Sequence, residues 1–457
     1  MRKLLSLKKD KEIYVVGGAV RDIVLGKNIL DIDFALKGSG MAFAEEAARK
    51  LKGAFVPLSE KDDEARVVIN KELVLDFKGF TDTLIQDLTA RDFTINAIAL
   101  SLDNVVSSKS FSPIDPFEGL KDIEKKRIKT VSRDSIKNDP LRILRAYRFK
   151  SQLGFEISHS LEKEAETTSL KDVARERISY ELKIILQAQK TYPIINRLIA
   201  TGLLEQIFPF PDFFRDYAVR AHSLMVFERL EHILNHKHFP PLINDIIERI
   251  NSAPEKRSLL KLTALFHDVS KPETLIKDKD GSMHFYGHDT RGAKKMLWTL
   301  SKILRFSNAE SEYVEQSIAR HMHLHLLATS QELTERAMRR YMRMCGSVAE
   351  DVMILDLADG FATAGRTRHL EKTITSILEL ASQDAKRSEF KPYVNGNDLI
   401  EIGLKPGPIF KIILAELEEL QWENKIQNKD EGIAHVKERL ESGEYTMSAE
   451  PADDSLK

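Results

Sequence analysis

The sequence lacks several features that would point to other classes of protein. Its 457 residues include a single cysteine, Cys345, which excludes an intramolecular disulfide and a cluster of cysteine ligands around a metal. No stretch approaches the roughly 18 consecutive apolar residues of a membrane-spanning helix, and the basic N-terminus, MRKLLSLKKDKE, lacks the apolar core of a signal peptide. These absences predict a soluble, cytoplasmic protein without a membrane partner.

The chain also lacks an excess of charge of either sign. Lysine and arginine (69) nearly balance aspartate and glutamate (70), so the formal net charge is −1. A nucleic-acid partner must therefore be bound by a local patch. Residues 121–150 are such a patch, since they hold eleven basic residues and four acidic ones. The length is sufficient for about three domains.

The segment 15–36, VVGGAVRDIVLGKNILDIDFAL, predicts a strand, a tight turn, a short helix and a second strand. Asp31 and Asp33 lie two residues apart on the second strand, so their side chains should project from the same face. Adjacent carboxylates repel each other unless a cation lies between them, which favours a Mg²⁺ site. Asp76, within the apolar strand LVLDFKGF, is predicted with equal weight to be a third carboxylate of this site or a solvent-facing residue.

A candidate phosphate-binding turn precedes these carboxylates. Gly17 and Gly18 allow backbone N–H groups to approach a phosphate closely, and Arg21 offers it a planar fork of donors. A metal pair beside a triphosphate-binding turn indicates nucleotidyl transfer. The complete pattern, GGxVRDxxLG followed by DxD, resembles the signature of the tRNA nucleotidyltransferase and poly(A) polymerase family, the bacterial-type branch of the polymerase-β-like transferases.

Two further motifs resemble those of the same family. The segment DLTARDFTINAIAL resembles its RRDFTINA motif, with Ala90 at the position of the first arginine. In this motif Arg91 can hold phosphate oxygens, Asp92 can accept a hydrogen bond from a ribose hydroxyl, and Asn96 is retained. The segment 114–119, IDPFEG, resembles the third motif and should close the head domain.

An arginine-rich helix is expected next, in NDPLRILRAYRF. Asp139 can cap this helix, and one face then carries three arginines at a spacing of three: Arg142, Arg145 and Arg148. The segment resembles the family's EDxxRxxRxxRF motif, in which the aspartate and the first arginine form a protein template for the incoming base. A carboxylate accepts from an exocyclic amine and a guanidinium donates to a ring nitrogen or carbonyl, so this pair should favour C and A over U and G. Asn138 replaces the usual glutamate.

A second set of ligand-type residues lies beyond residue 216. Its order resembles that of the HD phosphohydrolase superfamily, and the resemblance implies four ligands of one divalent metal: His222, His267, Asp268 and Asp359. His288 and His321 could serve a second metal or a phosphate. Because the site is rich in imidazole, it should prefer a transition-metal ion to Mg²⁺. The resemblance leaves open whether this domain is catalytic.

These patterns predict an α+β protein. A small head with a mixed β-sheet of the polymerase-β type should be followed by a mostly helical neck, an HD domain and C-terminal helices. The predicted boundaries are 1–137 for the head, 138–215 for the neck and RNA-binding region, 216–365 for the HD domain, 366–440 for the C-terminal body and 441–457 for a disordered tail.

The resemblance implies a Mg²⁺-dependent enzyme that completes the CCA end of tRNA from CTP and ATP without a nucleic-acid template. Three alternatives remain: an enzyme that adds only A or only CC, a poly(A) polymerase, and an HD phosphohydrolase as the main activity. The segment VPLSEKDDEARVVINKELVLDF is short and lacks the EVTTFR-like loop of full CCA enzymes, so it resembles the partial enzymes, particularly A-adding ones. A poly(A) polymerase is disfavoured because the chain has no strongly basic tail.

Overall fold

The computed structural model describes residues 1–29, 31–70, 73–107, 111–236, 238–386 and 392–445. Two compact units are present, one formed by Met1–Leu326 with Cys345–Glu371 and the other by Leu327–Met344 with the chain from Lys372 onwards. From residue 446 the predicted tail lies outside the described residues. None of the described helices is long and apolar enough to cross a membrane.

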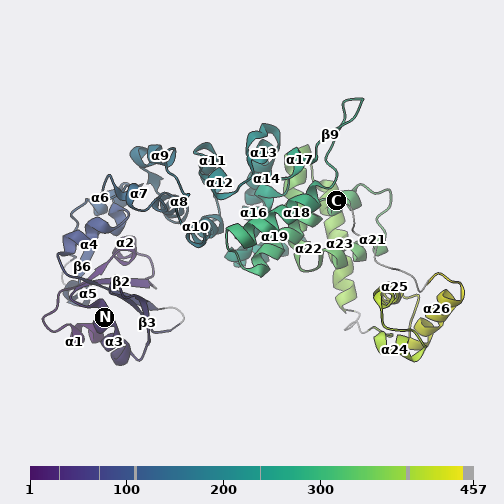
Figure 1. Cartoon of the computed structure of the whole chain (residues 1–457), viewed down its shortest axis with the longest axis horizontal. Coiled ribbons are helices and arrows are strands. Elements are labelled where there is room, and N and C mark those ends of the chain that lie inside the picture. The colour runs from purple at the N-terminus through teal and green to yellow at the C-terminus, as the bar shows by residue number, and fades with distance from the viewer. Residues whose placement is uncertain (30, 71–72, 108–110, 237, 387–391, 446–457) are drawn as a thin grey trace. The chain divides into compact units, whose positions relative to one another are not determined.

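The head, the purple part of Figure 1, is built on a six-stranded sheet in the order β3-β4-β5-β2-β1-β6. Only β2 and β5 are parallel neighbours, so the sheet is mixed, which confirms the predicted α+β class. The strands are β1 (Ile13–Val16), β2 (Asp31–Lys37), β3 (Ala54–Ser59), β4 (Glu64–Val68), β5 (Val74–Phe80) and β6 (Ala99–Ser101). The head helices are α1 (Arg2–Lys8), α2 (Gly18–Val24), α3 (Gly40–Leu51), α4 (Leu84–Ala90), α5 (Leu102–Ser107), α6 (Gly119–Glu124) and α7 (Ser135–Asn138).

The sheet core explains where the head carboxylates lie. Phe34 and Phe77 face each other across β2 and β5 with ring centroids 4.8 Å apart, and Phe43 of α3 packs on Phe77. Along β2 the residues after Asp33 are buried up to Leu36, whereas the first residues of the strand are exposed or half-buried. Burial of the apolar end anchors β2 in the core and leaves its acidic end at the rim of the sheet.

The neck begins with α8 (Arg142–Leu153), which contacts α10 (Arg175–Gln187). The expectation that Asp139 caps α8 is wrong, because the residue before the helix is Leu141 and no side chain caps it. Asp139 instead accepts from the backbone N–H of Leu141 (3.2 Å) and so supports the turn that leads into α8. The other neck helices are α9 (His159–Ala165), α11 (Tyr192–Ala200), α12 (Leu203–Ile207) and α13 (Pro211–Arg215).

A helical bundle follows in the first unit. Its central helices α14 and α22 pack on each other, and α18 packs on α19 (Figure 1). A short hairpin of β9 (Ile276–Lys277) and β10 (Met283–His284) precedes α18. The helices are α14 (Tyr217–Asn235), α15 (Pro241–Ser252), α16 (Pro254–Phe266), α17 (Lys271–Thr274), α18 (His288–Trp298), α19 (Asn308–Arg320), α20 (His323–Ala328) and α22 (Ala349–Ala364).

The second unit is helical, as predicted for the C-terminal body. Its own small core includes Val394, Leu399, Ile413, Leu417 and Val436. The unit contains most of α21 (Glu335–Cys345) and α23 (Arg368–Lys386), together with α24 (Gly396–Glu401), α25 (Pro408–Trp422) and α26 (Lys429–Glu441). The chain therefore leaves the first unit after residue 326 and returns to it at residue 345.

A buried ion pair joins the neck to the helical bundle. Lys261 is fully buried, and its ammonium donates to Glu231 (2.6 Å) and to the backbone carbonyl of Ala188 (2.6 Å). Burial lowers the pKa of Lys261, and the charge of Glu231 opposes that shift. The same carboxylate accepts from the backbone N–H of Thr191 (2.7 Å), so one charge cluster fixes the loop between α10 and α11.

Replacing Lys261 by methionine should destabilise the first unit. The change leaves a buried carboxylate without its cation, which typically costs about 3 kcal/mol or more. The measurement is the free energy of unfolding in urea. The double variant Lys261→Met with Glu231→Gln should recover much of the loss, because both charges are then absent and the amide oxygen can still accept from Thr191. A single variant as stable as the parent would contradict this role of the pair.

Candidate active site and candidate metal cluster

A polar pocket of about 550 Å³ lies in the head where β1 ends and β2 begins. It is lined by all twelve residues that the sequence analysis assigned to catalysis and nucleotide binding, namely Gly17, Gly18, Arg21, Asp31, Asp33, Arg91, Asp92, Asn96, Asp139, Arg142, Arg145 and Arg148. Sequence analysis missed Arg177, Phe149, Gln152 and Asp22, which also line it. Residues from separate motifs thus share one cavity.

Three carboxylates converge beside this pocket, and two of them, Asp31 and Asp33, line it. Asp31, Asp33 and Asp76 each offer an oxygen, and these oxygens lie within 4.8 Å of one another. Asp76 lies directly beside Asp33 because β5 pairs with β2 in parallel register. Its side chain is only 12% exposed, so of the two predictions for Asp76 the solvent-facing one is wrong. Arg66 of β4 holds Asp76 with two hydrogen bonds of 2.7 and 2.8 Å.

The electrostatics of this cluster favour a cation. Burial raises the pKa of Asp33 to about 6, the charge of Arg91 opposes the shift, and the charges of Asp31 and Asp76 add to it. Burial and the neighbouring Asp76 also raise the pKa of Asp31. A divalent ion would relieve this repulsion, and carboxylate oxygens are the ligands that Mg²⁺ prefers. The donor set therefore fits Mg²⁺.

Gly17 is required by the close packing around these carboxylates. Its φ is +72°, and a Cβ added there would lie 2.6 Å from Oδ2 of Asp33 and 2.8 Å from Nη1 of Arg91. Any larger residue would be strained and would displace one of these groups. Arg91 itself is held through Nε and Nη2 by Asp87 (3.2 and 3.1 Å), so its remaining nitrogen points towards the carboxylate cluster.

A buried hydrogen-bond network forms the opposite wall. Arg21 donates to Asn96 (2.7 Å), Asn96 donates to Asp92 (3.1 Å), and Arg145 donates twice to Asp92 (2.8 and 2.6 Å). Burial would raise the pKa of Asp92, but the charge of Arg145 and these hydrogen bonds outweigh it and lower the pKa. The other donors of Arg21 contact Asp22 (3.0 and 2.9 Å). In the structure these side chains therefore hold one another in position.

The three arginines of α8 have different partners, although they share a helix face. Arg142 donates to the backbone carbonyls of Ala90 (2.7 Å) and Arg91 (3.2 Å), which fixes the end of α4. Arg145 holds Asp92, as described above, and Arg148 pairs with Glu181 of α10 (3.0 Å). Next to them, Asp139 pairs with the pocket residue Arg177, also of α10 (2.8 Å). Helix α10 is therefore part of the pocket, a contribution that motif spacing could not reveal.

The second predicted site is also assembled in the first unit. Asp268 is fully buried, and its oxygens lie close to four imidazole Nε2 atoms, those of His222 (3.4 Å), His267 (3.3 Å), His288 (3.4 Å) and His321 (3.8 Å). Asp359 contacts Nε2 of His222 (3.1 Å) and of His325 (3.1 Å). The structure thus brings together all four predicted ligands and adds His325, whose only sequence signal is its spacing of four from His321.

The ring orientations in this cluster are set by the backbone. The Nδ1 atoms of His267, His288 and His321 lie 2.9, 2.7 and 2.6 Å from the carbonyls of Ala264, Phe285 and Ile318. An imidazole that donates from Nδ1 presents its Nε2 lone pair to the centre, as metal-binding histidines do. Burial lowers the pKa of His321 to about 4, which keeps that ring neutral at pH 7.

Unsatisfied polar atoms support a cation in this cluster. Oδ1 of Asp268 and Nε2 of His222 and His267 are buried and make no hydrogen bond within the described residues. Buried polar atoms of this kind cost free energy unless an ion or a water molecule satisfies them. Lys271 contributes one positive charge, with Nζ 2.6 Å from Asp268. The imidazole and carboxylate donors fit a divalent metal ion.

Models of known protein families match most of the chain. The poly A polymerase head domain matches residues 13–78 and 73–129, the probable RNA and SrmB-binding site of polymerase A matches 154–214, and the HD domain matches 219–364. The matched regions follow one another in the order predicted from the sequence.

Characterised relatives align over nearly the whole chain. An A-adding tRNA nucleotidyltransferase of Deinococcus radiodurans is 28% identical over 92% of this chain and 94% of its own length. A CC-adding tRNA nucleotidyltransferase of Thermus thermophilus is 29% identical over 93% of each.

Solved structures share the fold. A CCA-adding enzyme in an apo form aligns with a TM-score of 0.66 at 22% identity, over 96% of this chain and 93% of that one. The Thermotoga maritima CCA-adding enzyme, solved with tRNA, aligns with a TM-score of 0.62 at 23% identity, over 96% and 93% of the two chains. With its head, RNA-binding and HD regions in this order, the chain belongs to the tRNA nucleotidyltransferase and poly(A) polymerase family.

Proposed function

We propose that the protein is a template-independent nucleotidyltransferase that adds C, A or both to the 3′ end of tRNA. It uses CTP and ATP, releases pyrophosphate and acts in the cytoplasm. The observation that carries this proposal is one pocket whose lining includes Asp31 and Asp33 of the carboxylate cluster together with Asp139 and Arg142, the pair proposed to read the base. Relatives of nearly the same length are named for A addition and for CC addition to tRNA.

The carboxylates and cations of the pocket have complementary tasks. Asp31 and Asp33 would hold Mg²⁺, which lowers the pKa of the RNA 3′-hydroxyl and offsets charge on the phosphates. Arg91, whose free nitrogen points to this cluster, would hold triphosphate oxygens. The 3′ oxygen then bonds to the α-phosphorus while the bond to the departing pyrophosphate breaks. Asp76, neutralised by Arg66, would complete the metal-facing wall.

A short hairpin in the head bears on the choice between full and partial CCA addition. Strands β3 and β4 pair from Ala54 with Val68 to Ser59 with Glu64, so only residues 60–63 connect them. This short connection supports the partial enzymes as the first alternative, because a full CCA enzyme is expected to carry a longer flexible loop there.

The test is direct extension of tRNA. Transcripts ending in the discriminator base, in C or in CC are incubated with CTP and ATP singly and together, and the products are sequenced. A CCA enzyme extends all three to CCA, an A-adding enzyme extends only the CC end, and a CC-adding enzyme stops before A. Long A tracts would instead identify a poly(A) polymerase, and no addition to any transcript would refute the proposal.

Replacing Arg142 by alanine should impair base choice more than triphosphate affinity. One good contact to a base edge is worth about 1–3 kcal/mol, so discrimination against UTP and GTP should fall roughly tenfold. The measurement is kcat/KM for each of the four nucleoside triphosphates. Arg142→Lys keeps the charge without the planar fork and should also lose discrimination. A variant that rejects UTP and GTP as well as the parent does would contradict the base-reading role.

Addition should weaken at acid pH because the pKa of Asp33 is about 6. Below this pH a proton competes with Mg²⁺ for the carboxylate, so the Mg²⁺ concentration for half-maximal rate should rise roughly tenfold per pH unit. In the metal-free protein the folded state binds this proton more tightly than the unfolded chain, whose pKa is near 3.8. The contribution of Asp33 to stability therefore falls as the pH rises from about 4 to about 6. A Mg²⁺ requirement independent of pH between 5 and 7 would contradict the assignment.

A second activity is supported by the imidazole-rich cluster. We propose that His222, His267, Asp268 and Asp359 hold a transition-metal ion such as Mn²⁺ or Ni²⁺, which suits nitrogen ligands better than Mg²⁺ does. The site would then hydrolyse phosphate esters of nucleotides or RNA ends. The observation that favours it is the set of buried Nε2 and carboxylate atoms that make no hydrogen bond in the described chain.

A further inference from the structure

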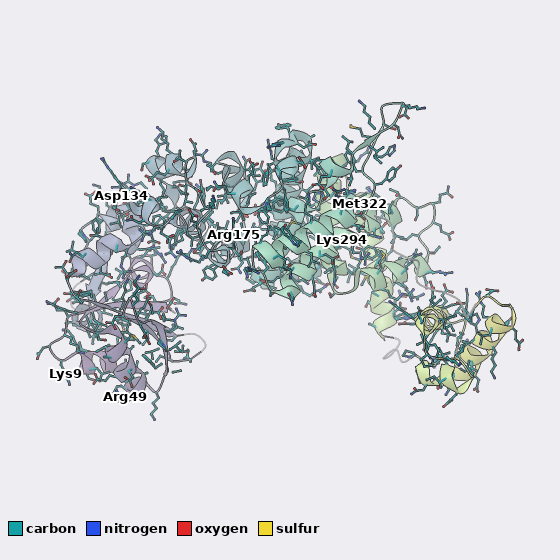
Figure 2. The ribbon with its side chains drawn as sticks, viewed as in Figure 1. Lys9, Arg49, Asp134, Arg175, Lys294 and Met322 are labelled. Carbon is teal, nitrogen blue, oxygen red and sulfur yellow. The ribbon has the colours of Figure 1, made fainter. Side chains whose placement is uncertain are left out.

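Helix α18 presents a basic and aromatic face to solvent. The helix begins at His288 in the metal cluster, and it packs on α19 through a side that includes Gly292, Ala293 and Met296. Arg291, Lys294 and Trp298 follow one another at spacings of three and four, so they share another side of the helix. Trp298 is 58% exposed, although tryptophan is usually well buried. Figure 2 labels Lys294 on this helix.

The charge of this segment is strongly one-sided. Residues 288–306 contain one acid, Asp289, and five basic residues: Arg291, Lys294, Lys295, Lys302 and Arg305. Lys302 is exposed in the π-helical turn Thr299–Ile303 that continues α18, and Arg305 follows it. Arg291 and Lys295 pair with Glu273 of α17, and Arg305 lies 3.9 Å from Glu176. Lys294 and Lys302 are exposed and have no ion-pair partner among the described residues, so their charges face solvent. A row of cations around an exposed indole has the composition of a nucleic-acid surface.

The far end of this row lies next to the neck helix α10. Arg305 lies 3.9 Å from Glu176 of α10, and the next residue of that helix, Arg177, lines the pocket and holds Asp139. Figure 2 labels Arg175, the first residue of α10. The α-helical part of this row, from Arg291 to Trp298, is about 10 Å long at a rise of 1.5 Å per residue. The row therefore begins on α18 and ends beside α10, the helix whose Arg177 lines the nucleotide pocket.

We propose that this α18 face, comprising Arg291, Lys294, Trp298, Lys302 and Arg305, binds the RNA whose 3′ end enters the head pocket. The proposal rests on the proposed function in that the substrate is RNA. The exposed Lys294 and Lys302 contact phosphates, and Trp298 stacks on an unpaired base. Charge complementarity and the contact of Arg305 with α10, a helix that lines the pocket, favour RNA over a protein partner.

The test compares tRNA binding by charge-reversal variants. The test variant combines Lys294→Glu with Lys302→Glu. The matched control combines Lys3→Glu with Lys50→Glu, which change two exposed lysines on α1 and α3 of the head. Fluorescence anisotropy with labelled tRNA gives Kd between 50 and 300 mM salt, and extension assays give KM and kcat. The α18 pair should weaken binding about tenfold or more at low salt and lower the salt slope by about two. Trp298→Ala should weaken binding roughly fivefold or more through the lost stacking.

The control pair should bind as the parent does, and kcat at saturating tRNA should stay unchanged for the α18 variants because none of these residues lines the pocket. Circular dichroism checks folding, and Lys294→Gln with Lys302→Gln replaces the reversed pair if that variant unfolds. Equal Kd for α18 and control variants overturns the proposal. If the parent self-associates, the α18 pair abolishes that association and tRNA binding is unchanged, the face is instead a contact between copies of the chain. If the parent binds tRNA tightly but adds no nucleotide, the proposed function is refuted and the RNA-binding role of the α18 face is not.

Discussion

Replacing Asp33 by asparagine should abolish nucleotide addition and at the same time stabilise the metal-free protein. The amide removes an anionic ligand from the carboxylate cluster, so the rate should fall by about 10³-fold or more. Because burial raises the pKa of Asp33 to about 6, ionising it at pH 8 opposes folding. A shift of that size corresponds to about 3 kcal/mol, part of which the neutral variant recovers.

Two measurements test both halves of this prediction. Extension of tRNA gives the rate, and thermal unfolding at pH 8 with EDTA gives the stability. Asp82→Asn, the same chemical change at an exposed acid outside the pocket, is the control and should alter neither. Addition at a near-normal rate by the Asp33 variant would refute the metal-binding role. A lower unfolding midpoint than the parent would refute the proposed cost of ionising this buried carboxylate.

Replacing Asp268 by asparagine should remove the metal from the second site and leave nucleotide addition largely intact. Asp268 is the carboxylate at which four imidazoles meet, and an amide lacks the negative charge that helps to hold a divalent ion there. The two sites share no residue, so extension of tRNA should continue. Any phosphatase activity of the protein should disappear.

The readouts are metal content by mass spectrometry and hydrolysis of phosphorylated nucleotides, beside tRNA extension. Asp278→Asn, in the hairpin that precedes α18, is the matched control and should keep its metal. Equal metal content in the Asp268 variant and the parent would rule out the ligand assignment. If the Asp268 variant loses its metal and neither it nor the parent shows phosphatase activity, the cluster acts as a structural support.

The geometry within each head motif could be predicted because it depends on local periodicity. Asp31 and Asp33 project together since alternate residues of any strand share a face, and the glycines before them mark a tight turn. Likewise the three arginines of α8 share a face because of helical spacing. The α+β class and the order of head, RNA-binding and HD regions were also predictable, since each region carries its own motif.

Partnerships between distant segments were decided only by the tertiary structure. Asp76 joins the carboxylates because β5 pairs with β2 in parallel, and no local pattern specifies that register. Arg177 reaches the pocket because α10 packs on α8, and His325 reaches Asp359 because helices far apart in the chain meet in the first unit. Periodicity states which side of an element is buried, whereas the packing of whole elements selects the partner. For this protein the sequence therefore determined the chemistry of each motif, and the fold determined which residues complete each site.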